Sequence, residues 1–375
     1  MKITYLALHL GYGGVERSII DRANLLSSKY EVTILCSYKI LDKPAFELSP
    51  NVKVKYLTDL KPNKEKVKNA LKKGKIISII KECLYAFKVL YYRKKSMIEE
   101  VKDIEAGIVI SSRLLFNDIL GKYGSKSLIK IAEEHNNHND NMKYVRSVVK
   151  SLKNIDYFLP VSNSLVTKYS KYLDKDKIKF IPHFVDLDVN KKNNLNTNTI
   201  ISVGRFSKEK GFIDLIRVFS KIENKSIKLI IAGDGEEYSS IKDEIKKYDL
   251  QDRVELLGFL EPKLLKDAYE KASLYVMTSY EESFGLVLIE AMNYGIPCVA
   301  FDSAKGATEI IKNEYNGYLV DNRDLTKMAG IIDNYFIYDD KEQLSTNCLL
   351  TAKEYSKSNI ESIWFDFIKE VSDDK

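Results

Sequence analysis

Short runs of apolar residues, many of them β-branched, alternate along the chain with longer segments whose apolar residues recur at helical spacing. This alternation is typical of βα units, in which helices connect parallel strands. The first half contains such runs at 2–8, 31–37, 52–57, 107–111, 129–133 and 157–161. The second half contains runs at 199–204, 228–232, 254–257, 274–277 and 298–301, and a weaker one at 318–320. We therefore predict an α/β fold with parallel sheets.

A polar stretch rich in Asn and Lys separates the two series of strands and predicts a linker at 187–198. The strand pattern restarts after it, and 375 residues exceed what one hydrophobic core usually supports. We expect two Rossmann-like domains, at 1–186 and 199–355, facing each other across a cleft that binds ligands. A C-terminal helix at 356–375 is expected to cross back to the first domain.

The composition, with 45% hydrophobic and 30% charged residues, is ordinary for a folded soluble protein. The chain has four cysteines, Cys36, Cys83, Cys298 and Cys348. They are far apart and lack metal-ligand spacing, so we expect reduced thiols in a cytoplasmic protein. The segment Met1–Leu10 is too short and strand-like for a signal peptide. No apolar run approaches the roughly 18 residues of a membrane-spanning helix.

Positive charge is concentrated in one segment. The net charge is +6, but residues 61–95 alone carry 12 Lys or Arg against two acids. Within this segment, apolar residues at helical spacing and lysines at every seventh position, Lys81, Lys88 and Lys95, predict a basic amphipathic helix. Its apolar face either packs on the N-terminal sheet or meets an anionic membrane surface together with the lysines. Because no recognition motif accompanies the charge, we expect no nucleic-acid partner.

Two glycines, Gly13 and Gly14, follow the first predicted strand and open a helix. Glycine lets the backbone approach a ligand closely, and the N-terminus of a helix attracts anions. The turn therefore either binds a diphosphate or is a tight connection that needs glycine for packing.

Two cations, Arg205 and Lys210, follow the first strand of the second half near the start of a helix. A guanidinium and an ammonium in this position can neutralise a departing diphosphate. An ordinary exposed loop also contains Arg and Lys, and the pair by itself leaves both interpretations open.

Two glutamates lie in the segment 279–299, which also contains glycines and an apolar run. Glu282 precedes a predicted helix and Glu290 lies within it, just over two turns later, so both carboxylates can face one side. There they can accept hydrogen bonds from sugar hydroxyls, while N–H groups at the helix start meet phosphate. The alternative is a capping acid followed by a solvent-facing glutamate.

These motifs occur in one order: Gly13-Gly14, Gly204-Arg205-x4-Lys210-Gly211, Gly233-Asp234-Gly235-Glu236, and Glu282-x7-Glu290 with Phe284-Gly285-Leu286. Together they resemble the motifs of the family 4 glycosyltransferases, which have the GT-B fold. The resemblance spans nearly the whole chain, and its Glu-x7-Glu block is highly specific. It implies transfer of a sugar with retention of anomeric configuration, without a metal or another cofactor.

The resemblance also implies roles for the residues that match the motifs. Arg205 and Lys210 would bind the donor diphosphate, Glu282 the hydroxyls of the donor sugar, and Glu290 the ribose. The backbone of three residues would line the sugar and phosphate: Phe284, Gly285 and Leu286. Gly13 and Gly14 would close over the donor from the other domain, and Gly233 and Phe259 would lie near the nucleobase.

Two of the four histidines, His135 and His138, follow the strand predicted at 129–133. A zinc site is weakly indicated, because no third ligand accompanies them. The resemblance instead implies that His135 reaches the reacting sugar and that His138 is a loop residue. His183 occupies the place of the asparagine in the family's Pro-Asn-Gly-Val-Asp, and it either fills that residue's role or covers the edge of the cleft.

We therefore expect a retaining transferase that moves a hexose or N-acetylhexosamine from a nucleotide diphosphate sugar, with UDP favoured, to a saccharide acceptor. The resemblance implies a lipid-linked acceptor and a role in surface polysaccharide or capsule biosynthesis. The enzyme would be cytoplasmic, with peripheral contact to an anionic membrane through 61–95. The alternatives are a catalytically silent sugar-nucleotide-binding protein that docks on membranes, and a GT-B epimerase or phosphorylase, which the Glu-x7-Glu block disfavours.

Overall fold

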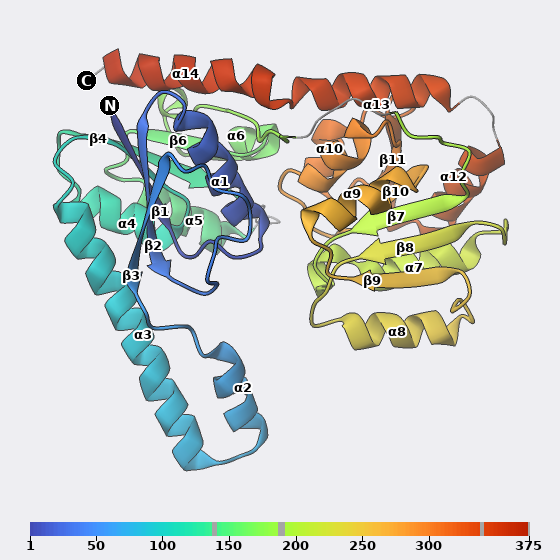
Figure 1. The fold of residues 1–375 in the computed structure, drawn as a ribbon, viewed down its shortest axis with the longest axis horizontal. Coiled ribbons are helices and arrows are strands. Elements are labelled where there is room, and N and C mark those ends of the chain that lie inside the picture. Colours follow the sequence, from blue (N-terminus) through green and yellow to red (C-terminus); the bar gives the residue numbers. More distant parts are fainter. Residues whose placement is uncertain (137–140, 187–191, 338–340, 374–375) are drawn as a thin grey trace. The chain divides into compact units, whose positions relative to one another are not determined.

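The computed structural model describes residues 1–136, 141–186, 192–337 and 341–373. The chain divides into two compact units, which are labelled by their elements in Figure 1. Unit 1 comprises Met1–Val161, Val166–Ile181 and Glu361–Lys375, and unit 2 comprises Ser162–Leu165 and Pro182–Ile360. Within the described residues, no helix has the length and apolar character needed to cross a bilayer.

Unit 1 contains a six-stranded parallel sheet with the order β3-β2-β1-β4-β5-β6. Its strands are β1 (Lys2–Ala7), β2 (Glu31–Tyr38), β3 (Val52–Thr58), β4 (Gly107–Ser111), β5 (Leu128–Glu134) and β6 (Tyr157–Pro160). The helices are α1 (Gly14–Leu26), α2 (Lys64–Lys72), α3 (Ile76–Lys102), α4 (Leu114–Tyr123) and α5 (Met142–Ser151), and α6 (Asn163–Tyr169) begins in unit 2. This strand order is that of a doubly wound fold, whose ligands bind beyond the carboxyl ends of the strands.

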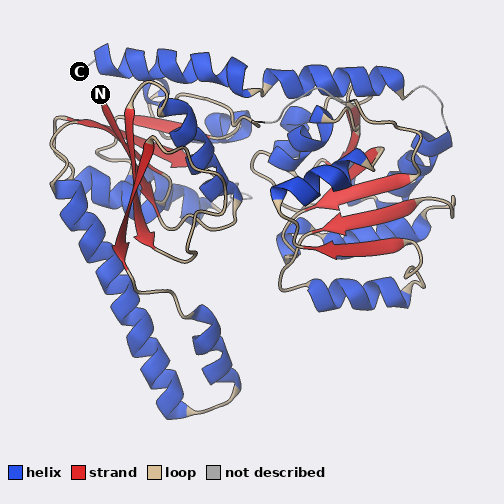
Figure 2. Ribbon diagram, in the orientation of Figure 1, coloured by secondary structure: helices blue, strands red, loops and turns tan. Residues whose placement is uncertain are grey.

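Unit 2 repeats the same topology with the order β12-β11-β10-β7-β8-β9, again parallel throughout. Its strands are β7 (Thr199–Val203), β8 (Lys228–Ala232), β9 (Val254–Gly258), β10 (Leu274–Met277), β11 (Cys298–Phe301) and β12 (Gly317–Val320). Its helices are α7 (Phe212–Lys221), α8 (Tyr238–Lys247), α9 (Pro262–Glu270), α10 (Leu286–Asn293), α11 (Lys305–Ile310), α12 (Leu325–Ile337) and α13 (Glu342–Glu354). Figure 2 shows the helices around each sheet. The α/β class and the predicted strands are confirmed, each strand to within a residue at either end.

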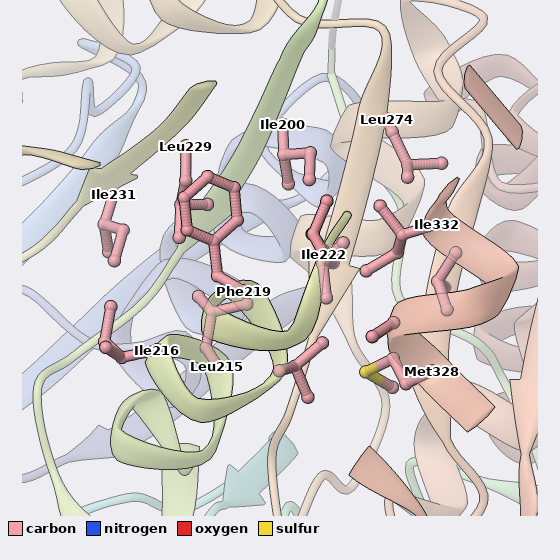
Figure 3. Close-up of a cluster of buried hydrophobic side chains, with 14 of the residues drawn as sticks. Ile200, Leu215, Ile216, Phe219, Ile222, Leu229, Ile231, Leu274, Met328 and Ile332 are labelled. Atoms are coloured by element: carbon pink, nitrogen blue, oxygen red, sulfur yellow. The ribbon is translucent and has the colours of Figure 1, made fainter. Parts of the chain in front are cut away.

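The core of unit 2 shows why its strands read as continuous apolar runs. Successive side chains of a strand point to opposite faces, and helices cover both faces of a parallel sheet. Ile200 accordingly packs with Phe219 of α7 and Met328 of α12, in the cluster drawn in Figure 3. The next residue, Ile201, packs on the other face with Leu288 of α10.

The segment between the two series of strands packs on unit 2 where it is described. Residues 187–191 of the linker expected at 187–198 lie outside the described residues. Asn193 is buried, and its Nδ2 donates to the carbonyl oxygens of Tyr269 and Ala272. This part of the chain is therefore held against the end of α9.

The C-terminal helix α14 (Lys357–Asp373) begins in unit 2 and continues from Glu361 in unit 1. Its Trp364 is fully buried there, with the guanidinium of Arg22 5.6 Å from the ring centroid. Its Phe367 meets Tyr157 edge to face, with ring centroids 5.9 Å apart. Burial of these large rings fixes the second part of α14 to unit 1.

The predicted basic helix is present as α3, preceded by α2, and the two helices lie against each other as a hairpin (Figure 1). The end of α3 packs on β2, β3 and α4, and its buried residues are Val89, Met97 and Val101. Packing of the whole apolar face on the sheet, one of the two expectations for this helix, is wrong. The apolar residues between Ile76 and Tyr91 are mostly exposed.

Candidate active site

The central contact of unit 2 joins two motifs that are far apart in the sequence. The Lys210 Nζ lies 2.6 Å from Glu282 Oε2, and both side chains are partly buried. Gly211 permits this approach because it takes the left-handed conformation, with φ of 66°, and a Cβ there would collide with the carbonyl oxygen of Thr278. The loops that follow β7 and β10 are thereby held together at the carboxyl edge of the sheet.

Arg205 is also paired with a carboxylate, but it is more exposed to solvent than Lys210. Its Nη2 donates to Glu209 Oε1 at 2.6 Å, and the Arg205 side chain is 72% exposed. Burial opposes ionisation of Glu209, but hydrogen bonds from its own backbone N–H, from Ser207 and from Arg205 outweigh it and lower its pKa. Sequence reasoning missed Glu209, because an acid between two cations reads as a solvated loop residue.

Glu290 lies inside α10 and is only 4% exposed. The Tyr269 hydroxyl donates to Glu290 Oε2 at 3.1 Å, and the Tyr269 ring stacks on Tyr294 with centroids 5.5 Å apart. The alternative of a solvent-facing glutamate is therefore wrong. The capping alternative for Glu282 is also wrong, because Gly285 is the N-cap of α10.

The start of α10 supplies the backbone that the motif predicts. Gly285 has φ of 100°, a conformation that suits glycine, and Leu286 is the first helical residue. Phe284 is buried beneath this turn, and its ring meets His183 edge to face at 4.9 Å. The N–H groups of a first helical turn lack intrahelical acceptors and carry partial positive charge, so this end of α10 suits an anion.

The two residues predicted to lie near the nucleobase, Gly233 and Phe259, have different surroundings. Gly233 brings two loops together, because a Cβ there would collide with the carbonyl oxygen of Gly204. Its N–H donates to the carbonyl of Gly258 at 2.8 Å. Phe259 follows β9 and is exposed. Gly233 thus has a packing reason to be glycine, whereas Phe259 carries an exposed side chain.

Arg323, which sequence reasoning missed, ties together the loop that carries Glu282. Its Nη2 pairs with Asp214 Oδ2 at 2.7 Å and donates to the carbonyl of Thr278 at 2.9 Å. Its guanidinium also lies 3.6 Å from the centroid of the Tyr280 ring. Arg323 and Asn322 both have positive φ, at 53° and 55°, so this turn is held in an uncommon backbone conformation.

In unit 1 a carboxylate occupies the turn where a diphosphate was one expectation. Glu16 is buried, and its Oε2 would collide with a Cβ at Gly13. Arg113 donates to Glu16 Oε1 at 2.9 Å, and His9 Nδ1 lies 3.7 Å from the same oxygen. Nothing lies close to the Cβ position of Gly14. The Glu16 carboxylate therefore fills the space beside Gly13, whereas the space beside Gly14 is open.

His135 directly follows β5 and is buried with two charged partners. Its Nε2 lies 3.1 Å from Glu133 Oε2, and Arg22 Nη2 donates to the same oxygen at 2.9 Å. Burial alone would raise the pKa of Glu133, but Arg22 and His135 hold it below its usual range. His138 lies outside the described residues, among which no group of three metal-ligating side chains gathers.

The comparisons with known proteins agree with this arrangement. The family model described as glycosyl transferases group 1 matches residues 186–346. The amylovoran biosynthesis glycosyltransferase AmsD of Erwinia amylovora is 38% identical over 124 residues, which cover 33% of this chain and 34% of AmsD. An N-acetyl-D-galactosaminyltransferase of Campylobacter jejuni, whose name gives a GalNAc-containing PP-undecaprenol as acceptor, is 24% identical over 99% of both chains.

Among solved structures, the pneumococcal O-GlcNAc transferase GtfA in complex with UDP and GlcNAc superposes with a TM-score of 0.77. The identity is 16%, and 99% of each chain is covered. At this identity the likeness concerns the fold, which is GT-B, with one doubly wound sheet in each of two units.

Proposed function

We propose that this chain, a glycosyltransferase of group 1 by its residues 186–346, transfers a hexose or N-acetylhexosamine from a nucleotide diphosphate sugar with retention of configuration. The acceptor is a saccharide in glycan or polysaccharide biosynthesis. The observation that carries the proposal is the contact between Lys210 Nζ and Glu282 Oε2. One phosphate-binding cation and one hydroxyl-binding carboxylate lie together beside the N-terminus of α10, as a sugar diphosphate requires.

The proposed reaction breaks the bond between the anomeric carbon and the diphosphate oxygen. Positive charge develops on the sugar ring and negative charge on the departing oxygen. Lys210 and Arg205 exchange their carboxylate partners for the diphosphate and stabilise that oxygen, together with the N–H groups at the start of α10. The acceptor hydroxyl attacks from the same face, and its proton passes to the departing phosphate. The cations supply the positive charge, so no metal is needed.

The remaining residues bind and orient the donor. Glu282 accepts hydrogen bonds from sugar hydroxyls, and Glu290, held by Tyr269, accepts from the ribose. Phe259 lies against the nucleobase, and His135 positions the sugar. None of these residues acts as a covalent nucleophile.

We propose a UDP-sugar as donor and a lipid-linked saccharide as acceptor. The pneumococcal transferase was solved with UDP, and the Campylobacter relative is named for an undecaprenol-linked acceptor. The chain would meet such an acceptor as a cytoplasmic, peripheral protein at the inner face of the cell membrane.

The test is incubation of the purified protein with UDP- and GDP-sugars and a lipid-diphosphate saccharide acceptor, with the product's anomeric configuration read by NMR. We expect an α-linked product from an α-linked donor, and undiminished turnover in the presence of EDTA. Loss of turnover in EDTA that is restored by Mg²⁺ would contradict the metal-free mechanism. An inverted product would contradict retention.

The matched control uses neighbouring carboxylates. Glu282→Ala should abolish transfer, whereas Glu281→Ala, which removes an exposed carboxylate one residue away, should leave transfer unchanged. Donor binding without any product or donor hydrolysis, unaffected by Glu282→Ala, would instead support a catalytically silent sugar-nucleotide-binding protein.

A further inference from the structure

Helix α3 has two different halves. Its second half is fixed to unit 1 by the buried residues Val89, Met97 and Val101, and it contacts β2, β3 and α4. Its first half extends beyond the strands of the sheet, with α2 alongside (Figure 1). The first half is thus held in place from one end.

An apolar strip runs along the outer side of this first half. It consists of Ile76, Ile80, Leu84, Phe87 and Tyr91, whose spacing of three or four residues places them on one helix face. Their exposed fractions range from 55% for Ile80 to 77% for Phe87, and Ile77 beside the strip is 85% exposed. A soluble protein seldom leaves so many large apolar side chains together in water without a partner for them.

The charges beside the strip are mainly positive, although Lys95 Nζ also lies 3.8 Å from Glu99 Oε1. Lys81, Lys88 and Lys95 recur at every seventh position and therefore line one border of the strip. Of the two acids in residues 61–95, Glu82 is engaged within the hairpin, because Asn63 Nδ2 donates to its Oε2 at 2.7 Å and to its carbonyl oxygen at 2.9 Å. The hairpin therefore offers an apolar strip with a cationic border.

We infer that the first half of α3 lies in the interface of an anionic bilayer, with the strip from Ile76 to Tyr91 among the acyl chains and the bordering lysines at the lipid phosphates. Lysine stems can lie along apolar surface while their ammonium groups reach the headgroups. This goes beyond a surface attraction of charge, because the apolar strip itself enters the membrane. Only the role that we assign to this insertion, bringing the enzyme to a lipid-linked acceptor, rests on the proposed function.

Two other occupants fit the surface less well. A second copy of the chain would bring together two segments that each carry 12 Lys or Arg against two acids, which repel one another. A nucleic acid would satisfy the lysines but leave Phe87 and Ile77 in water. An anionic bilayer matches both the charge and the apolar strip.

The first measurement is co-sedimentation of the full-length protein with vesicles of phosphatidylcholine, with and without phosphatidylglycerol, in the absence of donor and acceptor. We expect binding only with the anionic lipid. The triple variant Lys81→Glu, Lys88→Glu, Lys95→Glu should weaken partitioning by about 100-fold. The triple variant Ile77→Ser, Leu84→Ser, Phe87→Ser should weaken it at least about 10-fold.

Matched controls change the same chemistry elsewhere. Lys221→Glu, Lys242→Glu, Lys246→Glu alters three exposed lysines of unit 2, and Leu264→Ser, Leu350→Ser alters two of its exposed leucines. Both should bind vesicles as the unmodified protein does. The thermal unfolding temperature of each variant is measured as well. It should be unchanged, because the substituted side chains are exposed.

Insertion is measured directly with Phe87→Trp. The chain's one tryptophan, Trp364, is fully buried and gives a constant background. We expect lipids brominated in the acyl chain to quench the new tryptophan. Sedimentation without quenching would overturn the inference. So would vesicle binding by either triple variant that equals that of the unmodified protein, or equal binding of the unmodified protein to neutral and anionic vesicles. Self-association that depends on Phe87 in the absence of vesicles would assign the strip to a second copy instead.

These outcomes are separate from those of the transferase assay. Vesicle binding needs neither donor nor acceptor, so its failure leaves the chemistry of unit 2 untouched. Conversely, a chain that inserts but transfers no sugar would retain the docking surface and lose the proposed reaction.

Discussion

Both units place ionisable side chains near the carboxyl ends of their strands, but these side chains differ greatly in burial. In unit 1, Arg22, Glu133 and His135 are each at most 8% exposed and share the oxygen Glu133 Oε2. In unit 2, the pair between Lys210 and Glu282 is partly buried. The other pair joins Arg205, whose side chain is 72% exposed, to Glu209.

The difference decides which contacts can be exchanged for a ligand. Breaking a buried pair leaves an uncompensated charge in a medium of low polarity, so the partners in unit 1 are fixed. Pairs that water reaches contribute less, because water compensates each partner, so the more exposed cations of unit 2 can exchange their carboxylates for a phosphate at a lower free-energy cost. The buried cluster is suited to holding His135 in place, and the more exposed pairs of unit 2 are suited to receiving a charged substrate.

The largest effect that would test this contrast is Arg22→Met. It leaves the Glu133 carboxylate buried without its guanidinium, and we expect a loss of about 3–5 kcal/mol in the free energy of unfolding, measured in urea. Lys179→Met breaks an exposed pair with Glu370 in the same unit and should cost at most about 1 kcal/mol. Equal losses in the two variants would remove the distinction between fixed and exchangeable pairs.

The second test concerns catalysis in unit 2. Lys210→Met should lower kcat/KM by about 10²–10³, since a donor that stabilises developing negative charge is removed. The same variant should change the free energy of unfolding by no more than about 1 kcal/mol if the pair is exchangeable. Lys208→Met, at an exposed position two residues earlier, is the control and should keep full activity.

The third test is the pH dependence of stability. The folded-state pKa of Glu133 is lowered by Arg22 and His135 against the opposing effect of burial. Its contribution is therefore complete above the unfolded-state pKa, near 4.5, and is lost as pH falls toward the folded-state value. Urea unfolding between about pH 6 and pH 3 should show a steeper acid loss in the unmodified protein than in Glu133→Gln. Parallel curves would mean that Glu133 does not titrate differently on folding.

The fold could be predicted from the sequence because local pattern and turn chemistry specify it. The runs at 107–111 and 228–232 are strands with the predicted bounds, since the buried part of a strand covered on both faces must be apolar. Lys210 and Glu282 could be found because each lies within a few residues of a strand end or helix start. Their contact at 2.6 Å follows from two parallel strands ending at the same edge.

The partners that complete these contacts could not be predicted, because they come from distant segments. Arg22 lies in the middle of α1, where a charged residue reads as a solvent-facing position, yet it is buried against Glu133. Arg323 follows a weak strand and carries no motif. The sequence also leaves open whether the apolar face of α3 is exposed, because helical periodicity shows that a face is apolar but not whether another element covers it.

The smallest expected effect is the sharpest test of exchange. In the proposed reaction Glu209, whose Oε1 accepts a hydrogen bond from Arg205 Nη2 at 2.6 Å, competes with the donor diphosphate for Arg205. Glu209→Gln removes that competition, so the affinity for UDP, measured by calorimetry, should rise by up to about 5-fold. Glu255→Gln, which removes an exposed acid of β9, controls for the change in net charge and should have a smaller effect. Weaker UDP binding by Glu209→Gln would show that Glu209 holds Arg205 in its binding position, so the exposed pair would be a fixed one despite its contact with water.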